Sequence, residues 1–520
     1  MYFSFSDAWP KPFDDFKNLL FYSGSGLVFL YCLFRDKNLK IPFWPALLFL
    51  IYIFFALLSI QIPIYEGFLA WARLLLWGGL AWSFSRCSGN ERLYLMKAAV
   101  LSAALIGVLG ILWVFEIRFV AYSAYMVTPI GWVAYYGDFM ALHLPMVFYL
   151  FESESNRKKK ILWFGCLVLI LTGLWISGSR ASILGFAAAF FWMVMRWRRW
   201  KWIAFAVMVV FALAFFLPKS LQDNSVLKRW TYTSDMTNGR WINYLVTADM
   251  ITAKPWRGWG MGSYRFIFPE FAYQRPGQWV QTEKEWYVHP HNELLHQWSE
   301  TGFLGLLAFV SFWSFLLWRG VRLPRSPQMV SAVAGLLIVL VSWQFSTAFL
   351  NPLIRALTAF YVGWMLQQIS CRTVTVKQIR PVLFFIGGAA IFFVTAYNTS
   401  LYAYWKSRTA PDDSAKKEWA RRAHSLAPLA FDSLYVYVDA FLREPPFEKG
   451  QAATRQLYRE FPFVPSVLYQ TASLKIQEKK PVEAIVLLDH ALRNAPGFDL
   501  AENVRNYLKR DLKKENPPGK

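Results

Sequence analysis

Three of the chain's six histidines, His289, His291 and His296, fall within eight residues. Imidazoles bind metal ions, and they exchange protons near neutral pH. His291 and His296 are five residues apart, which would turn them about 140° from each other on a helix. His289 and His291 could chelate in an extended loop, but no acidic or cysteine cluster is expected to complete a ligand set. We therefore expect no metal site and no cofactor, and interpret His291 as a group that exchanges a proton.

Three arginines, Arg180, Arg240 and Arg265, are predicted at the outer face of a membrane, where topology does not require cations. Each taken alone could extend to lipid phosphates. A guanidinium group also binds a diphosphate through two parallel hydrogen bonds. The glycine-rich segment 258–262 lets the backbone approach a ligand or fold tightly against the membrane. Guanidinium groups that hold a diphosphate leaving group beside a proton acceptor indicate glycosyl transfer from a lipid diphosphate.

The composition places these residues in a membrane protein. The 520 residues are 56% hydrophobic, 19% aromatic and only 17% charged, which excludes a soluble, disordered or disulfide-framed chain. The four cysteines show no CxxC spacing, so neither a zinc site nor a disulfide scaffold is expected. The net charge of +22 is concentrated in short loops between apolar runs. That pattern is typical of membrane topology, and we expect no nucleic-acid partner.

The sequence predicts an all-α, polytopic membrane protein of about twelve transmembrane helices. A helix needs about 20 apolar residues to cross a bilayer. Runs of this kind lie near 18–34, 41–60, 64–84, 95–115, 125–150, 161–177, 181–195, 202–217, 299–318, 329–350, 353–370 and 381–404. Residues 1–17 have no basic region before an apolar core, so no cleavable signal peptide is expected.

The positive charges predict the orientation. Alternate loops hold Arg35, Lys37 and Lys40; Arg86, Arg92 and Lys97; Arg157 to Lys160; Arg196, Arg198, Arg199 and Lys201; Arg319, Arg322 and Arg325; Arg372, Lys377 and Arg380. These six loops should face the cytoplasm. The intervening short loops hold only Arg118, Arg180 and Arg355.

The predicted organisation has five parts. They are an extracytoplasmic segment 1–17, transmembrane helices 1–8 over 18–217, an extracytoplasmic catalytic loop 218–298, transmembrane helices 9–12 over 299–405, and an extracytoplasmic helical domain 406–520. The site and the C-terminal tail are thus expected on the periplasmic side.

The tail contains a period. Pro428, Pro462 and Pro496 are spaced 34 residues apart, and each separates two helix-like runs. This spacing resembles the tetratricopeptide repeat, in which a helical pair buries its apolar face against the next pair. The alternative is an irregular helical bundle. The tail shows no set of acid, base and nucleophile, so we expect a docking or scaffolding role with a protein partner.

The motifs resemble those of a known superfamily. The run His291-Asn292-x-x-Leu295, followed by Glu300-x-Gly302-x-x-Gly305, is similar to the signature of the O-antigen ligase and polymerase superfamily. The segments 177–182 and 240–262 resemble its other motifs, and the likeness covers about residues 20–370.

The resemblance implies a metal-independent, inverting glycosyltransferase in the bacterial plasma membrane. Such enzymes transfer a glycan from a polyprenyl-diphosphate carrier to an acceptor hydroxyl at the outer face. Arg180 and Arg240 would contact the diphosphate, and His291 would orient or deprotonate the hydroxyl. The substrate-binding candidates are Arg265, Gly260, Gly262, His289 and Asn292.

Several residues have structural interpretations. Asn292 is expected to cap a helix, and Glu293 to favour the positive end of its dipole. Gly302 and Gly305 are expected to permit close helix packing.

The sequence does not identify the acceptor, which is lipid A core, a second lipid-linked glycan or a protein side chain. We favour ligation to lipid A core. The partners are then the lipid-linked donor, one of these acceptors and membrane lipids. Two other classes remain, a transporter or flippase and a scaffold of an envelope polysaccharide machine. Asp138 and His143 are the ionisable groups within one predicted span, and we interpret them as a structural polar pair.

Overall fold

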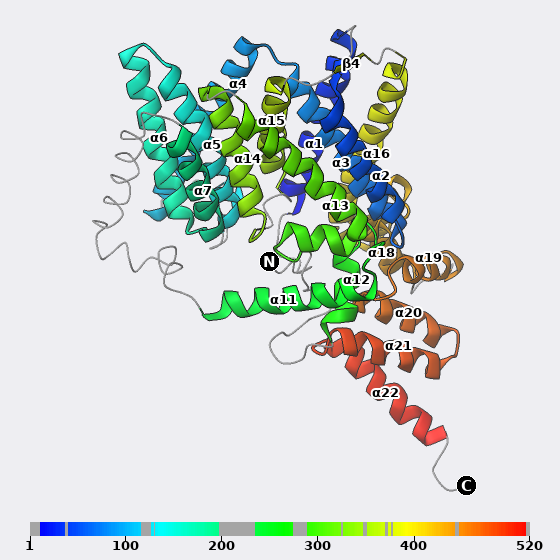
Figure 1. The fold of residues 1–520 in the computed structure, drawn as a ribbon. Coiled ribbons are helices and arrows are strands. Elements are labelled where there is room, and N and C mark those ends of the chain that lie inside the picture. The colour runs from blue at the N-terminus through cyan, green and yellow to red at the C-terminus, as the bar shows by residue number, and fades with distance from the viewer. Residues whose placement is uncertain are drawn as a thin grey trace.

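The computed structural model describes residues 11–36, 40–115, 126–128, 130–196, 234–273, 289–323, 326–346, 351–369, 373–375, 378–442 and 447–515. The described chain is almost entirely helical (Figure 1). Strands form only two short antiparallel pairs in this part, β1 (Lys40–Pro42) with β4 (Thr373–Thr375) and β2 (Met126–Thr128) with β3 (Gly131–Trp132). The all-helical class is confirmed. The predicted span 202–217, Arg118 and Cys371 lie outside the described residues.

In the described part of the chain, eleven helices form the bundle. They are α1 (Lys11–Arg35), α2 (Phe43–Ser59), α3 (Ile64–Ser85), α4 (Gly89–Val114), α5 (Val133–Ser153), α6 (Arg157–Ser177), α7 (Arg180–Arg196), α13 (Glu293–Arg322), α14 (Pro327–Ser342), α15 (Pro352–Gln368) and α16 (Arg380–Arg408). Among the described residues, α1, α4, α6, α13 and α16 are long and apolar enough to cross a membrane, and α2 and α14 are shorter apolar helices. The count of twelve spans stays a prediction.

Basic helix ends meet at one end of the bundle. Arg86 forms an ion pair of 2.6 Å with Asp36, and Arg380 Nη2 donates to the carbonyl of Phe34 at 2.7 Å. Strands β1 and β4 pair beside them (β4 is labelled at the top of Figure 1). Arg196 at the end of α7 donates to the carbonyl of Val321 near the end of α13. Loops that the charge pattern assigns to one side of a membrane therefore lie together.

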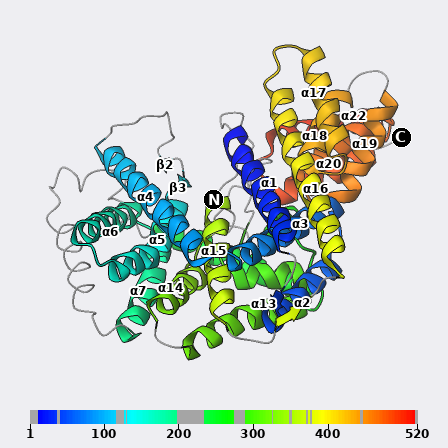
Figure 2. The same cartoon turned by 90° about the horizontal axis from the view of Figure 1, so that it is seen from above.

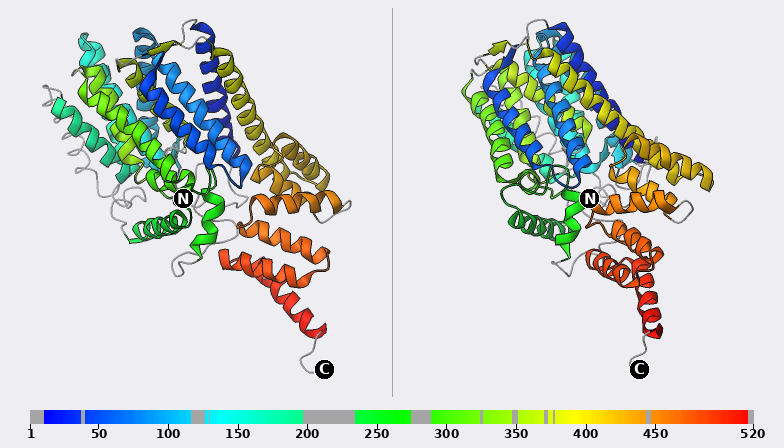
Figure 3. Two further views of the ribbon diagram at one scale, coloured as in Figure 1. Left: turned by 45° about the vertical axis from the view of Figure 1, so that its right-hand side comes forward. Right: turned by 90° about the vertical axis from the view of Figure 1, so that its right-hand side faces the viewer.

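Two further helices lie at the other end of the bundle. Helix α11 (Ser234–Ala253) runs across this end, and α12 (Tyr264–Ala272) lies beside it (Figures 1 and 3). Both belong to the segment predicted as a catalytic loop. The residues with candidate chemistry therefore come from short helices and turns that cover one end of the bundle.

Helix α13 has a kink at Gly302, whose φ is 71° and ψ is −176°. A Cβ atom at this position would lie 2.1 Å from the carbonyl oxygen of Trp256, and the next residue, Phe303, donates its N–H to Pro255 at 2.9 Å. Only glycine fits a left-handed backbone this close to another chain segment. Gly302 thus lies against the turn at 255–257, and the kink separates the first two turns of α13 from its longer apolar part. The predicted role in helix packing stays a prediction.

The tail is a series of antiparallel helical pairs. It consists of α17 (Asp413–Leu426), α18 (Phe431–Phe441), α19 (Phe447–Glu460), α20 (Pro465–Gln477), α21 (Pro481–Asn494) and α22 (Asp499–Glu515). The first helices of the pairs begin at 413, 447 and 481, and the second helices at 431, 465 and 499, so both sets keep the 34-residue spacing. The three prolines lie in the turns within the pairs. The tetratricopeptide assignment stays a prediction.

The tail shares a core with the helices at the site end of the bundle. The ring of Phe266 in α12 lies 5.2 Å from that of Phe431 and 4.7 Å from that of Phe461. Glu66 at the start of α3 accepts from the N–H of Phe431 at 3.2 Å and forms an ion pair of 3.3 Å with Arg265. Figure 2 shows the tail on the α1, α3 and α16 side of the bundle, away from α6 and α7. The tail is thus packed against the segment that carries the candidate site.

A second polar contact joins α12 to the tail. The carboxylate of Glu270 accepts from His490 Nε2 at 2.7 Å, Arg493 Nη2 at 3.1 Å and Asn494 Nδ2 at 3.1 Å. Burial would raise the pKa of this carboxyl, but the hydrogen bonds from His490 and Asn494 and the charges of His490 and Arg493 outweigh it and lower the pKa. The ionised form therefore stabilises the contact.

We predict that Glu270→Gln weakens docking of the tail at neutral pH by about 1–3 kcal/mol, because charge-assisted hydrogen bonds are lost. A carboxyl group whose pKa is lowered by folding contributes its full stabilisation when the pH is above the usual pKa of about 4.3. This stabilisation is lost as the pH falls through the lowered pKa. Amide exchange in α12 and α21 should be faster in the variant at pH 7, and wild type should match the variant only in acid.

Glu483→Gln is the matched control, since Glu483 lies on the exposed side of α21, where it pairs with Lys475. It should leave exchange in α12 unchanged. Equal exchange in α12 for wild type and Glu270→Gln at pH 7 would contradict the role of Glu270.

Candidate active site

Arg180 is the first residue of α7, directly after the turn that ends α6. Gly178 adopts a φ of 58° and ends α6, and Arg180 is exposed. The start of α7 is held by Ser182, whose hydroxyl donates to the carboxylate of Asp138 at 2.7 Å. Ser346, beyond the end of α14, donates to the other oxygen of Asp138 at 2.9 Å. A buried carboxylate therefore fixes the segment that carries Arg180 to the segment after α14.

The predicted pairing of Asp138 with His143 is wrong. Asp138 accepts from the two serines, whereas His143 Nδ1 bonds the carbonyl of Phe139 at 2.7 Å. The two residues are five positions apart on α5, which turns their side chains about 140° from each other. The polar pair that crosses between helices is instead formed by Asp138 and serines far away in sequence.

The start of α13 is held by the same segment after α14. Asn292 caps the helix as predicted, because its Oδ1 accepts from the N–H of Leu295 at 3.0 Å. Its Nδ2 donates to the carbonyl of Gln344 at 3.4 Å, and the N–H of Glu293 donates to the carbonyl of Trp343 at 3.0 Å. Residues 343–346 therefore connect the start of α13, next to His291, with the Asp138 contact next to Arg180.

His291 lies in a tight turn before α13. Its φ is 59°, an uncommon left-handed value for a residue with a Cβ atom. The N–H of His291 donates to His289 Nδ1 at 2.9 Å, and the carbonyl of His289 accepts from Asn243 Nδ2 at 3.1 Å. Asn243 lies on α11, three residues after Arg240, so both are on one side of that helix. The turn with His291 is thereby attached to the helix that carries Arg240.

The surroundings of His291 favour its neutral form. Burial is the largest cause, and it lowers the pKa of His291 well below its usual value. Arg240, which is half-buried, makes a smaller contribution in the same direction. His291 is therefore a neutral imidazole at neutral pH, and its ring can accept a proton.

His289 and Glu293, which are buried, and His296, which is half-buried, form a cluster. One ligand atom from each lies within 4.8 Å of the others, and Glu293 Oε2 is 3.1 Å from His289 Nε2. The expectation that no acidic group completes a ligand set with these histidines is wrong, because Glu293 joins His289 and His296. The prediction is based on the angle between His291 and His296 on a helix. His289, however, precedes α13 and folds back over the first turn of that helix. The spacing of Glu293, His296 and Glu300 on one helix face is the sequence signal that could have indicated this cluster.

The hydrogen bonds within this cluster make it poorly suited to bind a metal ion. His289 Nδ1 accepts the N–H of His291, so the ring proton of a neutral His289 lies on Nε2 and faces Glu293. A metal ion at Nε2 would need the lone pair that this proton occupies. The oxygens of Glu293 also accept from Gln297 Nε2 at 2.7 Å. Hydrogen bonds therefore engage His289 and Glu293, whereas His296 Nδ1 has no hydrogen-bond partner among the described residues and lies 3.8 Å from Glu293 Oε1.

Gly260 and Gly262 lie against protein backbone. Gly262 has a φ of 76°, and its Cβ would meet the carbonyl oxygen of Glu66 at 2.7 Å. Its N–H donates to Glu300 Oε2 at 2.9 Å, and the N–H of Gly260 donates to the carbonyl of Glu300 at 2.9 Å. The turn is thus folded tightly onto α13 and the start of α3. Substrate contacts by Gly260 and Gly262 stay predictions.

Arg265 lies on the side of α12 that meets the tail. Burial opposes its charge, but the Glu66 carboxylate, which forms an ion pair with Arg265, outweighs this and raises the guanidinium pKa. On another side of α12, the hydroxyl of Tyr264 donates to Asn243 Oδ1 at 2.8 Å. A role for Arg265 in binding a diphosphate stays a prediction.

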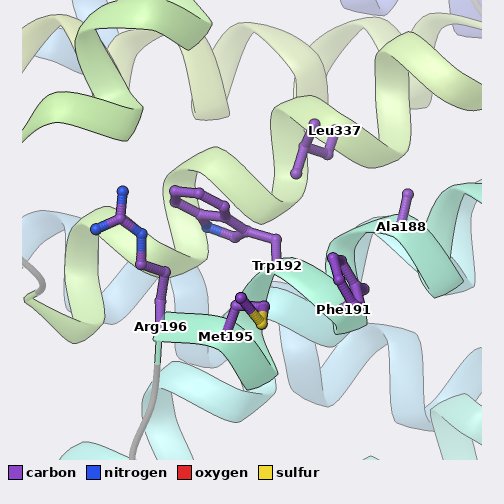
Figure 4. Close-up of a pocket in the computed structure, with 6 residues that line it drawn as sticks. All are labelled: Ala188, Phe191, Trp192, Met195, Arg196 and Leu337. Carbon is purple, nitrogen blue, oxygen red and sulfur yellow. The ribbon is translucent and has the colours of Figure 1, made fainter.

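A cavity of about 460 Å³ lies at the other end of α7, lined by Ala188, Phe191, Trp192, Met195, Arg196 and Leu337 (Figure 4). Sixteen residues separate Arg196 from Arg180, which corresponds to roughly 24 Å along a helix. Phe191 and Met195 are exposed apolar side chains. This cavity is a groove on the apolar flank of the bundle, and it contains none of the candidate site residues.

The long apolar helices suggest a membrane protein, and the turn with His291 is bonded to the helix that carries Arg240 at one end of its bundle. Residues 165–310 match the family model for O-antigen ligase, and the match spans Arg180, Arg240, Arg265, His289 and His291. The match covers less than half of the chain, and it supports the resemblance to the O-antigen ligase superfamily that the motifs indicated. No curated protein matches the chain. This match suggests a membrane enzyme of glycan transfer.

We predict that Arg240→Gln raises the pKa of His291 toward the usual value of about 6.5, because a nearby positive charge is removed. Diethyl pyrocarbonate modifies neutral imidazole, and peptide mass spectrometry resolves His291 from the other histidines. The pH midpoint of modification should lie below 6.5 in wild type, should be higher in Arg240→Gln, and should stay low in Arg240→Lys. An identical midpoint in all three proteins would contradict the influence of Arg240.

Proposed function

We propose that this protein transfers a glycan from a polyprenyl-diphosphate carrier to an acceptor hydroxyl at the outer face of the bacterial plasma membrane, and that the reaction is ligation of O-antigen to lipid A core. The proposal rests on the match to the O-antigen ligase family model and on the arrangement of Arg240 and His291. One observation carries it: the helix with Arg240 is bonded through Asn243 to the turn that presents a neutral His291.

The proposed chemistry is a single inverting displacement. The acceptor oxygen forms a bond to the anomeric carbon while the bond from that carbon to the phosphate oxygen breaks. The hydroxyl proton passes to the neutral ring of His291. The polyprenyl diphosphate leaves with the bonding electrons, and Arg180 and Arg240 stabilise the negative charge that develops on it.

The proposed orientation follows from the two ends of the bundle. The basic helix ends face the cytoplasm by the positive-inside rule. The end with α11, α12, the start of α13 and the tail then faces the periplasm, where lipid-linked glycans are transferred. The tail would dock a protein partner through its repeated helical pairs. The remaining substrate contacts proposed are Arg265, Gly260, Gly262, His289 and Asn292.

We predict that Arg240→Ala and His291→Ala each lower transfer by about 10²–10³-fold, because each removes a group that acts in the transition state. A strain without the gene should accumulate lipid-linked glycan and lose glycan on lipid A core. Wild type should restore the product, whereas both variants should be present in the membrane and fail to restore it.

Arg257→Ala is the matched control, since Arg257 is an exposed arginine near the same end of the bundle. It should restore the product. Full restoration by His291→Ala would contradict the enzyme and favour a scaffold. Loss of a glycoprotein or of polymer length, with glycan still on lipid A core, would assign the acceptor to a protein or to a second lipid-linked glycan instead.

We also propose that transfer needs no metal ion, since guanidinium groups supply the positive charge and the His289 cluster is engaged in hydrogen bonds. Purified protein in lipid nanodiscs should keep its transfer rate in EDTA within about twofold. Loss of activity in EDTA that is restored by added Mg²⁺ or Zn²⁺ would contradict this. A Glu293→Gln variant would then show whether the cluster holds the ion.

A further inference from the structure

The groups around the proposed site form a closed ring of polar contacts between α11, α12 and α13. Asn243 Nδ2 donates to the carbonyl of His289 at 3.1 Å, and Asn243 Oδ1 accepts from the hydroxyl of Tyr264 at 2.8 Å. The N–H of Tyr264 donates to Glu300 Oε1 at 3.1 Å. Glu300 Oε1 lies 3.3 Å from His296 Nε2. The ring thus runs from α11 through α12 to the second turn of α13.

The ring closes through the first turn of α13. His296 Nδ1 lies 3.8 Å from Glu293 Oε1, an ion-pair distance rather than a hydrogen bond, and Glu293 Oε2 lies 3.1 Å from His289 Nε2. His296 therefore stands between two carboxylates, with its charge balanced by Glu293 and Glu300. His289 closes the ring and also accepts the N–H of His291.

Asn243 is the link between the two halves of the site. Its side chain is fully buried, at 0% exposure, and both of its polar atoms are hydrogen-bonded. It lies three residues after Arg240 on α11, and it bonds the residue two positions before His291. A displacement of either segment relative to the other would break at least one bond of this amide.

We propose that Asn243 is a positioning residue that holds Arg240 and His291 in register for transfer, acting through the carbonyl of His289 and the hydroxyl of Tyr264. This inference rests on the proposed function for its catalytic consequence. Its structural content, the attachment of the 289–291 turn to α11, does not depend on that function. A shift of about 1 Å between reacting groups lowers rates by as much as 10²-fold.

The test is Asn243→Asp. Aspartate keeps the size and the acceptor for Tyr264 but has no donor for the carbonyl of His289, and it places an oxygen against that carbonyl. We expect kcat for transfer from a defined lipid-linked glycan to fall about 10–100-fold, with the protein still monodisperse and its melting temperature lowered by a few degrees. Amide exchange at residues 289–293 should be faster.

A double variant separates positioning from a general loss of stability. Asn243→Asp is also introduced into the His291→Ala variant. There it should lower kcat by less than a quarter of the fold-decrease that it causes in the wild-type protein, because the group that Asn243 positions is gone. A purely structural defect would cost the same factor in both backgrounds.

Asn351→Asp is the matched control. Asn351 Nδ2 donates to the carbonyl of Ile130 at 3.2 Å, a bond between segments distant in sequence, and Oδ1 caps α15. Aspartate keeps the cap and loses the donor. This variant should keep kcat within about twofold.

The outcomes distinguish the two claims. If His291→Ala keeps full transfer, the proposed function is wrong, and amide exchange at 289–293 still decides whether Asn243 anchors the turn. If His291→Ala is inactive while Asn243→Asp keeps wild-type kcat and wild-type exchange at 289–293, the positioning inference is overturned and the proposed function stands.

Discussion

The structure of the site depends on one buried carboxylate, that of Glu293 at the start of α13. A buried carboxylate is costly unless hydrogen bonds and opposite charges satisfy it. Here His289 and Gln297 supply hydrogen-bonding groups, and His296 supplies the nearby charge. Gln297 in turn accepts from the hydroxyl of Tyr52 on α2 at 2.7 Å. The need to satisfy Glu293 therefore draws the histidine turn and α2 onto the first turns of α13.

The backbone around this carboxylate is as constrained as the side chains. Gly302 lets α13 kink directly against Trp256, and Gly262 lets the preceding turn reach the carboxylate of Glu300. The tail packs against the same region, because Glu66 contacts both Arg265 and the start of α18. The site end of the bundle is therefore a single packed unit to which the tail contributes. Changes in the tail should reach the site through α12.

Sequence reasoning could predict features that depend on local rules. The helical class follows from apolar runs, the cap at Asn292 from its residue type before a helix, and the 34-residue spacing from the prolines. Hydrogen-bond partners that are distant in sequence could not be predicted in this way. Asp138 bonds serines on two other segments rather than His143, and His289 reaches Glu293 only because the left-handed turn at His291 folds it back. The role of Asn243 could not be recognised from the sequence, because its hydrogen-bond partners lie on α12 and in the turn before α13.

The most direct test of the account is photocrosslinking with a diazirine placed on the diphosphate of a lipid-linked glycan analogue, followed by peptide mapping in nanodiscs. We expect labelling of the first turn of α7, of the second turn of α11, which carries Arg240, and of the segment 289–292, with competition by unlabelled donor. Labelling confined to the basic end of the bundle, or to the groove near Arg196, would contradict it.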